Sequence, residues 1–530
     1  MMFMDKEKEQ IRYSIILRTF ICCLFLSACI GIGSCESSVV SEWKYGGSND
    51  DWGYALVAHP DGPVVMAGIS YSNDGDIPLQ KGGGDLWILA VELDGTKRWS
   101  RSYGGTNSDY ALSMKPVSSG GYILCGTTGS EDGNIVGYRG YGDGWILRLD
   151  SNGNLLWSLV LGGSDKDEFG DIIENKDGTF TAVGYTFSDD GDVSVQRGAG
   201  DAWVVRISTD GKLMSSKTYG GSATDTASSV IEAEDGNLII LGTTYSQGLS
   251  PTYAGESDVW IFSVTPEGEM IWSRTFGGSG SESGHALCEK DGYYYVAAVT
   301  SSRDGDVKQL RGASDIWILK LNQSGDLIWS KTYGGRFSEN AWDIKPMGDG
   351  LIIVGETNSV DGDITKNHGA PDVWVLFIDS DGTLLWQECI GDERFNSGQR
   401  VWPIDDKNAW ILSYGQDQGS EFGSYVLTKI VLPEIEQSVP YVLPEIPPDK
   451  PLLPFPGQSN LPRDLDGDGL YEDINGNGRA EFADLALFFE HMDWVSENQP
   501  IALFDFNRNG KVDFGDLQAL QEIVEKALSS

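Results

Sequence analysis

One unit of 57 or 58 residues repeats along most of the chain, and this repeat limits the possible folds more than any other feature. Each copy opens with a Gly-Gly pair, and the first glycines of these pairs are Gly46, Gly104, Gly162, Gly220, Gly277, Gly334 and, in a degenerate copy, Gly391. An Asp-x-Trp triplet keeps the same register in six copies, from Asp85 and Trp87 to Asp372 and Trp374. A fixed period of this kind is typical of folds in which each unit needs its neighbours to bury a core.

Within a unit, apolar and polar residues alternate with the period of a β-strand. In the sixth copy we predict four strands, at 341–345, 351–356, 373–378 and 384–390, separated by Asp-Gly turns. Glycine supplies the positive φ that tight turns need. Four strands in every unit predict a mainly β fold, a β-propeller, because each blade of a propeller is a four-stranded sheet. A β-helix and a linear solenoid are the minor alternatives, since their repeats are normally shorter.

The two ends of the repeat region indicate how the propeller closes. After Gly391 we predict only three strands, at 400–404, 409–414 and 425–431. The segment 42–45 has the pattern of a fourth strand but precedes the first unit. Pairing this N-terminal strand with the last blade would complete a seventh blade and remove an exposed sheet edge. We therefore predict a seven-bladed propeller within residues 36–432.

The unit from Gly162 to Tyr219, with the order GG…DGTFTAVGYT…GDAWVVRIS…DGKL, resembles the surface β-propeller repeats often called SBBP-type. The resemblance covers roughly residues 42–432 and implies an extracellular scaffold or binding propeller that is usually not catalytic. Five units also carry an Asp-Gly-Asp or Asp-Gly-Asn turn, at 74–76, 132–134, 190–192, 304–306 and 361–363. These carboxylates could hold cations, but the requirements of tight turns explain them better.

The composition changes at residue 433. Nine prolines from Pro433 to Pro462 interrupt any helix or ladder and predict an extended linker over 433–462, followed by a small domain at 463–530. Two stretches of this domain match the 12-residue calcium loop, whose oxygen ligands stand at positions 1, 3, 5, 7, 9 and 12. The first loop offers Asp473, Asn475, Asn477, the carbonyl of Arg479, Glu481 and Asp484, and the second offers Asp505, Asn507, Asn509, the carbonyl of Lys511, Asp513 and Asp516. Gly478 and Gly510 occupy the sharp sixth position.

A third calcium site is an open question. Asp464, Asp466 and Asp468 can begin a further loop that shares Asp473, but its twelfth position falls on Asn475, a weak ligand. Both complete loops lead into helical patterns, with apolar faces at 485, 488, 489 and 492 and at 517, 520, 524 and 528. These patterns predict a small α-helical domain that needs Ca²⁺ to fold.

The loop–helix order and the terminal aspartates resemble dockerin type I repeats over about 473–527. This resemblance implies that the residues named above bind Ca²⁺ and that the domain docks to a protein partner, such as a cohesin-like domain. The loops start 32 residues apart, which is longer than expected for a cellulosomal dockerin. A component of the cell envelope is therefore an equally suitable partner.

Residues 1–35 have the pattern of an export signal, with Lys6, Lys8, Arg12 and Arg18 before an apolar run at 20–32. Within that run Leu26-Ser27-Ala28-Cys29 matches a lipobox, in which Cys29 would carry a lipid, and ordinary cleavage near 33–35 is the alternative. We expect an extracellular or cell-surface protein that meets a membrane only through this N-terminal lipid or signal anchor. The formal charge of −41 argues against nucleic-acid binding.

Together these features predict an exported, non-catalytic binding or scaffold protein. Its propeller would bind a carbohydrate or a protein, and its calcium module would dock it. The chain has four histidines and lacks HExxH and GxSxG motifs. The alternative is a polysaccharide-active hydrolase with paired carboxylates in the propeller channel, delivered to an extracellular complex by the same module. Beyond Ca²⁺, we predict no cofactor and no catalytic residue.

Overall fold

The computed structural model of the chain describes residues 38–59, 62–249, 255–433, 452–465 and 470–499, and shorter pieces at 501–504, 506, 511–512, 516–517, 519–521 and 523–524. The chain separates into two compact units, divided between residues 435 and 436. The expected export signal, the lipobox and positions 434–451 of the expected linker lie outside the described residues. In the part of the chain that the structure describes, no helix has the length and apolar character to cross a membrane.

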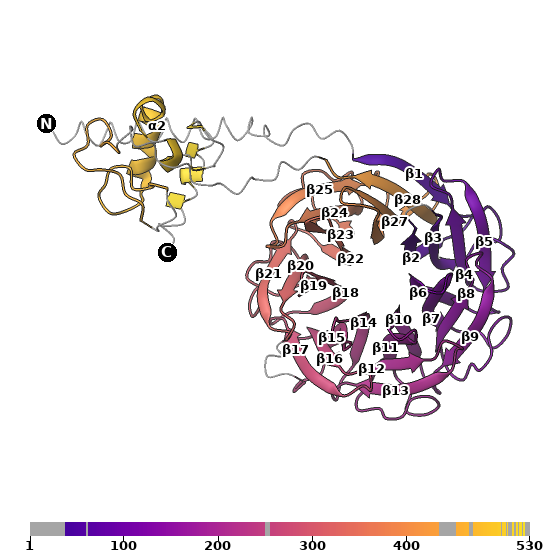
Figure 1. Cartoon of the computed structure of the whole chain (residues 1–530). Helices are drawn as coiled ribbons and strands as arrows, with labels where there is room; N and C mark the ends of the chain where they lie inside the picture. The colour runs from indigo at the N-terminus through magenta and orange to yellow at the C-terminus, as the bar shows by residue number, and fades with distance from the viewer. Residues whose placement is uncertain are drawn as a thin grey trace. The chain divides into compact units, whose positions relative to one another are not determined.

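The first unit is a seven-bladed β-propeller, made of seven four-stranded antiparallel sheets (Figure 1). The innermost strands are β2 (Asp51–Ala58), β6 (Asp109–Pro116), β10 (Asp167–Glu174), β14 (Asp225–Glu232), β18 (Glu282–Lys290), β22 (Glu339–Met347) and β26 (Asn396–Pro403). The second strands are β3 (Val64–Ser70), β7 (Tyr122–Thr128), β11 (Phe180–Thr186), β15 (Leu238–Thr244), β19 (Tyr293–Thr300), β23 (Gly350–Thr357) and β27 (Asn408–Gln416).

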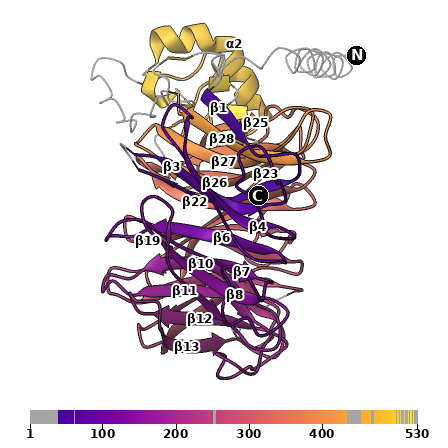
Figure 2. The same ribbon diagram turned by 90° about the vertical axis from the view of Figure 1, so that its right-hand side faces the viewer.

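The third strands are β4 (Asp85–Val91), β8 (Asp143–Leu149), β12 (Asp201–Ile207), β16 (Asp258–Val264), β20 (Asp315–Leu321), β24 (Asp372–Ile378) and β28 (Gly423–Val431). The outer strands are β5 (Lys97–Tyr103), β9 (Leu155–Leu161), β13 (Leu213–Tyr219), β17 (Met270–Phe276), β21 (Leu327–Tyr333), β25 (Leu384–Ile390) and β1 (Val39–Tyr45). In the side view of Figure 2, β10 to β13 of one blade lie in this order. The blade count and the strands predicted in the sixth unit are confirmed.

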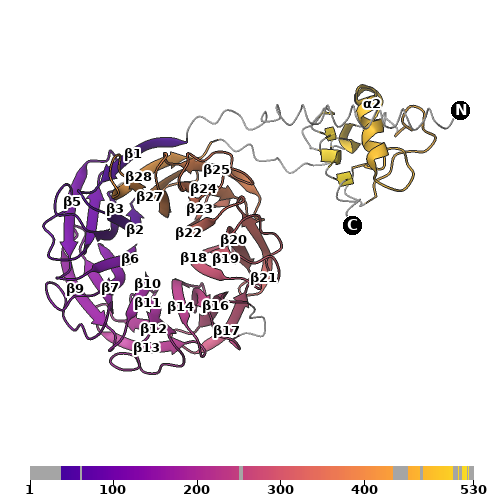
Figure 3. The ribbon, with the colours of Figure 1, turned by 180° about the vertical axis from the view of Figure 1, so that it is seen from behind.

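The seventh blade joins the two ends of the propeller, as the sequence predicts. Strand β1 is the outer strand of this blade and pairs antiparallel with β28, placing Trp43 opposite Leu427 and Tyr45 opposite Tyr425. Figure 3 shows β1, in indigo, beside the orange-brown β28. The pairing begins at Val39, three residues before the predicted strand. Because β1 is the fourth strand of this sheet, the closure of the ring depends on it.

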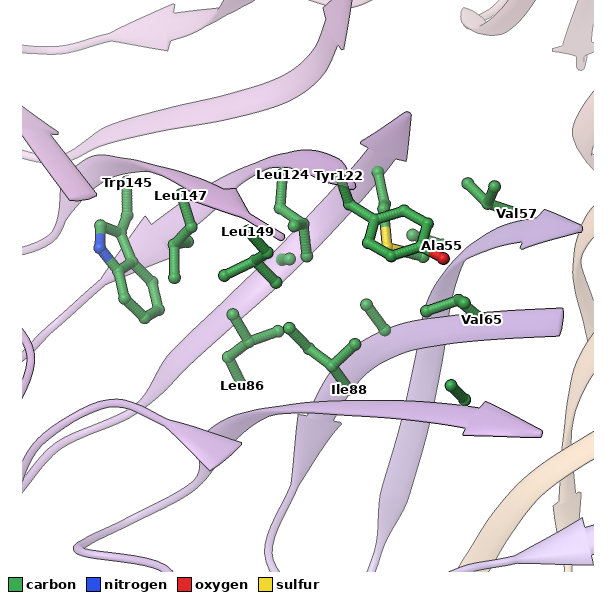
Figure 4. Close-up of a cluster of buried hydrophobic side chains, with 14 of the residues drawn as sticks. Ala55, Val57, Val65, Leu86, Ile88, Tyr122, Leu124, Trp145, Leu147 and Leu149 are labelled. Carbon is green, nitrogen blue, oxygen red and sulfur yellow. The ribbon is translucent and has the colours of Figure 1, made fainter. Parts of the chain in front are cut away.

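The tryptophans of the Asp-x-Trp triplets pack between blades. Six of them are fully buried, namely Trp87, Trp145, Trp203, Trp260, Trp317 and Trp374. Figure 4 shows one such cluster, where Leu86 and Ile88 of one blade meet Leu124, Trp145 and Leu147 of the next. Since large aromatic rings carry much of the burial energy in a core, this repeated contact explains why the triplet recurs.

Each Gly-Gly pair lies where two neighbouring blades meet. A Cβ on Gly104 would lie 2.4 Å from Oδ1 of Asp85 in one blade and 2.7 Å from Oδ2 of Asp109 in the next. The carboxylate of Asp109 accepts hydrogen bonds from the N–H of Gly105 (2.8 Å) and the hydroxyl of Ser130 (2.7 Å). Only glycine leaves room for this approach, so the pair closes the junction between blades.

The Asp-Gly-Asp turns bind the loops that follow the Gly-Gly pairs. Oδ1 of Asp74 accepts the N–H of Ser48 (2.7 Å), and Gly75, at φ +66°, lies against the carbonyl of Gly46. The four equivalent aspartates, Asp132, Asp190, Asp304 and Asp361, accept a backbone N–H in the same way. These turns therefore stabilise the loops of the blade, as the sequence interpretation favoured.

The second unit contains helix α2 (Phe482–Asn498) and the short 3-10 helix η1 (Ile501–Leu503). The described residues between 516 and 524 are also helical. Leu485, Phe488 and Val495 of α2 form one buried cluster with Leu520 and Val524 of that second helical stretch. The two predicted apolar faces thus pack together within a small core.

Phe489 is an exception to the predicted apolar face of α2, since 49% of its surface is exposed. The backbone at His491 leaves helical geometry, with φ −124° and ψ 17°, which kinks α2 in its second half. A buried face at 485 and 488 leaves residue 489 at its edge, because successive helical residues are turned by about 100°.

Candidate calcium loop and propeller axis

The first predicted calcium loop, from Asp473 to Asp484, is described in full. Asp473 opens the loop and Asp484 closes it on the first turn of α2, and both side chains are fully buried. Gly478, at the sixth position, has φ +87°, a conformation that favours glycine. The structure thus brings the first and twelfth ligand positions into the interior of a single tight loop.

Main-chain hydrogen bonds fix how the two buried carboxylates point. Asp473 accepts the N–H groups of Asn477 (2.9 Å) and Gly478 (2.6 Å). Asp484 accepts the N–H groups of Asn475 (2.9 Å) and Glu481 (2.9 Å). These four bonds wrap the loop around the two carboxylates and fix their orientation.

The side chains at the fifth and ninth positions also meet. Asn477 donates from Nδ2 to Oε1 of Glu481 (2.7 Å). Glu481 is at the same time the N-cap of α2, where its side chain and that of Asp484 form a reciprocal capping box. The calcium loop and the start of the helix are therefore one structural element.

The electrostatics of this loop fit a divalent cation. Burial raises the pKa of Asp484 to about 6, and the charges of Asp473 and Glu481 contribute to the rise. Two buried carboxylates in one loop repel each other unless a proton or a cation lies between them. The donors are all oxygen atoms, from carboxylates, amides and the carbonyl of Arg479, which is the set that Ca²⁺ prefers.

The described residues do not contain a group of charged or metal-ligating side chains that could hold a metal ion without rearrangement. Among them, His, Cys, Asp and Glu side chains do not gather in groups of three that could hold a metal ion. In the first loop, half of the expected ligands are the amides of Asn475 and Asn477 and the carbonyl of Arg479. Affinity would therefore depend on the loop tightening around the ion.

The other predicted ligands are only partly described. Asp505, Asn507, Asn509 and Asp513 of the second loop, and Asp466 and Asp468 of the third, lie outside the described residues. Lys511 and Asp516 are described, and Asp516 is fully buried at the start of the second helical stretch, as Asp484 is on α2. Upstream of the first loop, Arg463 and Asp473 exchange two main-chain hydrogen bonds (3.0 and 3.2 Å), which places Asp464 beside the first ligand.

The blade junctions carry buried carboxylates that the sequence interpretation missed. They stand five residues after the first glycine of each pair, as Asp51, Asp109, Asp167, Asp225, Glu282 and Glu339, with Asn396 in the degenerate unit. The spacing G-G-x3-Asp or G-G-x3-Glu is visible in the sequence and could have revealed them. Burial raises the pKa of Asp51, a member of this set, to about 6. Burial also raises the pKa of aspartates that open the Asp-x-Trp triplets, to about 6 for Asp143 and above the ordinary value for Asp85, Asp201, Asp315 and Asp372.

The innermost strands bring a second group of polar and aromatic side chains to the axis of the ring. Each of these strands has a register shift between its third and fifth residues, as between Gly53 and Ala55 of β2. Such a bulge redirects the side chains around it. The second and fourth residues of β2, β6, β10, β14, β18 and β22 are half-buried: Trp52 and Tyr54, Tyr110 and Leu112, Glu168 and Gly170, Thr226 and Ser228, Ser283 and His285, and Asn340 and Trp342.

Several contacts link these residues around the axis. Trp52 stacks on Tyr414, with ring centroids 3.7 Å apart. Tyr110 donates to Oε2 of Glu168 (2.8 Å). Arg400 of β26 donates from Nη2 to the carbonyl of Leu112 on β6 (3.2 Å), so its guanidinium reaches past the intervening blade. The innermost strands therefore bring aromatic rings, hydroxyl groups and a cation together around the centre of the ring.

No family model matches the chain. It is 26% identical over 228 residues to the regulatory protein FlaEY of Caulobacter vibrioides (strain ATCC 19089 / CIP 103742 / CB 15), a match that covers 40% of this chain and 23% of that protein. The chain thus spans less than a quarter of the length of this relative.

The comparison with solved structures finds matches of low sequence identity and with TM-scores under 0.5. They include the WD40 domain of Neurospora crassa Pan2 (9% identity, TM-score 0.39, 73% of this chain and 97% of that chain). A protein of unknown function from Dyadobacter fermentans (10%, 0.40, 74% and 99%) and puromycin hydrolase (13%, 0.42, 74% and 55%) are others. At these scores the similarities say nothing about what this chain binds.

Proposed function

We propose that this is an exported binding or scaffold protein that docks through a calcium-dependent C-terminal module. The observation that carries the proposal is the loop from Asp473 to Asp484, whose first and twelfth positions are fully buried carboxylates that accept main-chain N–H groups of the loop. A Ca²⁺ ion there would remove the repulsion between the carboxylates and fix the first turn of α2. The resemblance to dockerin repeats supports a docking role.

The propeller supplies the binding surface in this proposal. Its blades are joined by buried tryptophans and by repeated hydrogen bonds, which makes a rigid ring. Half-buried aromatic residues of the innermost strands, such as Trp52 and Tyr110, suit a carbohydrate or protein ligand, because flat rings stack on apolar surfaces. Export is supported by the N-terminal leader pattern, with or without a lipid on Cys29.

Calcium titration of the full chain by isothermal calorimetry, after removal of metal with EDTA, tests the proposal. We expect two binding events, and we expect the double variant Asp473→Asn/Asp484→Asn to lose one of them. The control is Asp132→Asn, which changes a carboxylate that accepts a backbone N–H in a propeller turn. Heat of binding that is absent in the unaltered chain, or that survives the double variant unchanged, would overturn the proposal.

A further inference from the structure

A chain of hydrogen bonds on the propeller axis ends at a histidine. Oγ of Ser283 lies 3.0 Å from Nε2 of His285, two residues further along β18. Nδ1 of the same ring lies 2.6 Å from the carbonyl oxygen of Ala341, on the neighbouring innermost strand β22. The imidazole is therefore held at both nitrogen atoms.

The partners of the ring determine where its proton lies. A carbonyl oxygen can only accept, so Nδ1 carries the hydrogen, and in the neutral ring Nε2 is left as an acceptor for the hydroxyl of Ser283. Burial lowers the pKa of His285, and the charge of Arg400 lowers it too, which favours the neutral ring. This is the tautomer that a general base needs when it takes a proton at Nε2.

Neighbouring groups hold Ser283 in the matching orientation. Oγ1 of Thr243 accepts the N–H of Gly284 (3.2 Å) and lies 3.3 Å from Oγ of Ser283. With Ser283 donating to His285, the Thr243 hydroxyl is the donor toward Ser283. Trp342 stacks on the face of His285, with ring centroids 4.7 Å apart and planes at 14°. The pair is thus fixed by contacts from two neighbouring strands, β15 and β22.

Ser283 and His285 stand on the innermost strand of their blade. Ser283 and His285 are half-buried residues of an innermost strand, and β18 is among the strands that border the centre of the ring in Figure 1. Within the described part of the chain, Nε1 of Trp342 is buried and has no hydrogen-bond partner, so an N–H donor next to His285 is unused. Arg400 lies near enough to influence the charge of His285.

We infer that Ser283 and His285 form a nucleophile and general-base pair that hydrolyses a small carboxylic ester at the propeller axis. Oγ of Ser283 attacks the ester carbonyl while its proton passes to Nε2 of His285. The bond to the alcohol then breaks, and the alcohol leaves with that proton. Water attacks the acyl-serine, gives a proton to His285, and the acid is released with the Ser283 hydroxyl restored.

The charge at the site favours one class of ester. The guanidinium of Arg400 bonds to the carbonyls of Gln399 (2.7 Å) and Leu112 (3.2 Å), and among the described residues it has no carboxylate partner in an ion pair. A cation that bonds to neutral carbonyls attracts an anionic group on a ligand. An ester with a carboxylate in its acyl part is therefore preferred over a neutral one. The esterase role of this pair does not depend on the proposed docking role.

Labelling of the full chain with a fluorophosphonate, located by mass spectrometry, tests the pair directly. We expect the label on Ser283, its loss in Ser283→Ala, and a rate lower by about 10²- to 10⁴-fold in His285→Gln, the usual contribution of a general base. The matched control is Ser330→Ala. Ser330 stands on β21, the outer strand of the same blade, and donates to the main-chain carbonyl of Asp306 (2.8 Å), so its removal should not slow the labelling.

Alkylation of a cysteine at position 283 and cleavage of two p-nitrophenyl esters test the pair further. Ser283→Cys should react with iodoacetamide at residue 283, located by mass spectrometry, faster in the presence of His285 than in combination with His285→Gln. The three cysteines of the propeller, Cys125, Cys288 and Cys389, are buried. Mono-p-nitrophenyl succinate should be cleaved faster than p-nitrophenyl acetate. Absence of label on Ser283 in the folded chain, or equal labelling rates in the unaltered chain and in His285→Gln, would overturn the inference.

Discussion

The propeller and the C-terminal unit bury their apolar side chains in different ways. The propeller repeats one contact around a ring, with a fully buried tryptophan in the third strand of six blades. The C-terminal unit has one cluster, which includes Phe488 and Leu520, and a loop whose two end carboxylates are also buried. A small core beside buried charge needs an additional source of stability, and a bound metal ion can supply it. Ca²⁺ should therefore contribute greatly to the stability of the C-terminal unit and little to that of the propeller.

Deleting β1, residues 39–45, should have the largest effect on the propeller. The deletion removes every pair between β1 and β28 and exposes the edge of the seventh blade. We expect the melting temperature of the propeller to fall by about 10 °C or more, measured by circular dichroism, because several kcal/mol are lost. The control is Val40→Ala, at a side chain that is 57% exposed. An unchanged melting temperature after the deletion would contradict closure by β1.

Trp203→Ala should come next in size. The side chain is fully buried between blades and donates from Nε1 to Ser216 (2.9 Å). Removing a buried tryptophan typically costs about 3–5 kcal/mol. Met214→Ala, at an outer-strand side chain that is 55% exposed, should cost little. Urea unfolding of the two variants measures the difference, and equal losses would show that burial between blades does not stabilise the ring.

Gly104→Ala should give a smaller loss. The added methyl group would meet Oδ1 of Asp85 at 2.4 Å and Oδ2 of Asp109 at 2.7 Å, so one blade must shift at the junction. Overpacking of this kind costs about 1–3 kcal/mol. In Gly83→Ala the new methyl lies 3.7 Å from its nearest neighbour, so this variant serves as the control. A stability of Gly104→Ala equal to that of Gly83→Ala would refute the tight junction.

Acid should stabilise the propeller against unfolding and weaken Ca²⁺ binding to the C-terminal unit. In the folded propeller the pKa values of Asp51 and Asp143 are about 6, above the ordinary value of 3.8, so the folded state binds their protons more tightly. The stability they contribute is therefore complete below about pH 4 and is lost as the pH rises through 6. Lowering the pH from 7.5 to 5 should raise the free energy of unfolding of the propeller, and Asp143→Asn should reduce this gain. A loss of propeller stability over this range would contradict the prediction.

In the calcium loop the same pH change should weaken binding. Asp484 has a pKa of about 6 without metal, so a proton competes with Ca²⁺ for this carboxylate at pH 5. We expect calorimetric Ca²⁺ affinity to fall on going from pH 7.5 to 5. An affinity that does not depend on pH would show that Asp484 is not a ligand.

The sequence predicts the propeller well because its signals are local and repeated. Alternation with period two and Asp-Gly turns mark each strand, and a seven-fold repeat averages out errors in single units. The role of Asp109 was missed because it depends on Gly104 and Asp85, which approach only when blades close. The exposure of Phe489 was missed because the apolar pattern does not show that residue 489 lies at the edge of the face buried at 485 and 488.

The pair of Ser283 and His285 could not be predicted from the sequence. The two residues are neighbours on one strand, but Ala341 and Trp342, which hold the ring, come from the next unit. No sequence motif joins residues that stand a whole repeat apart. The ligands of the first calcium loop are predicted from spacing alone, because all of them lie within 12 consecutive residues.

Differential scanning calorimetry of the full chain, with excess EDTA and then with excess Ca²⁺, tests the contrast between the two regions most directly. We predict two transitions, of which only the one from the C-terminal unit moves upward with Ca²⁺. At a concentration 100 times the dissociation constant, each ion adds about 2.7 kcal/mol. The propeller transition should stay where it is. A scan in which Ca²⁺ shifts neither transition, or shifts that of the propeller, would contradict the account.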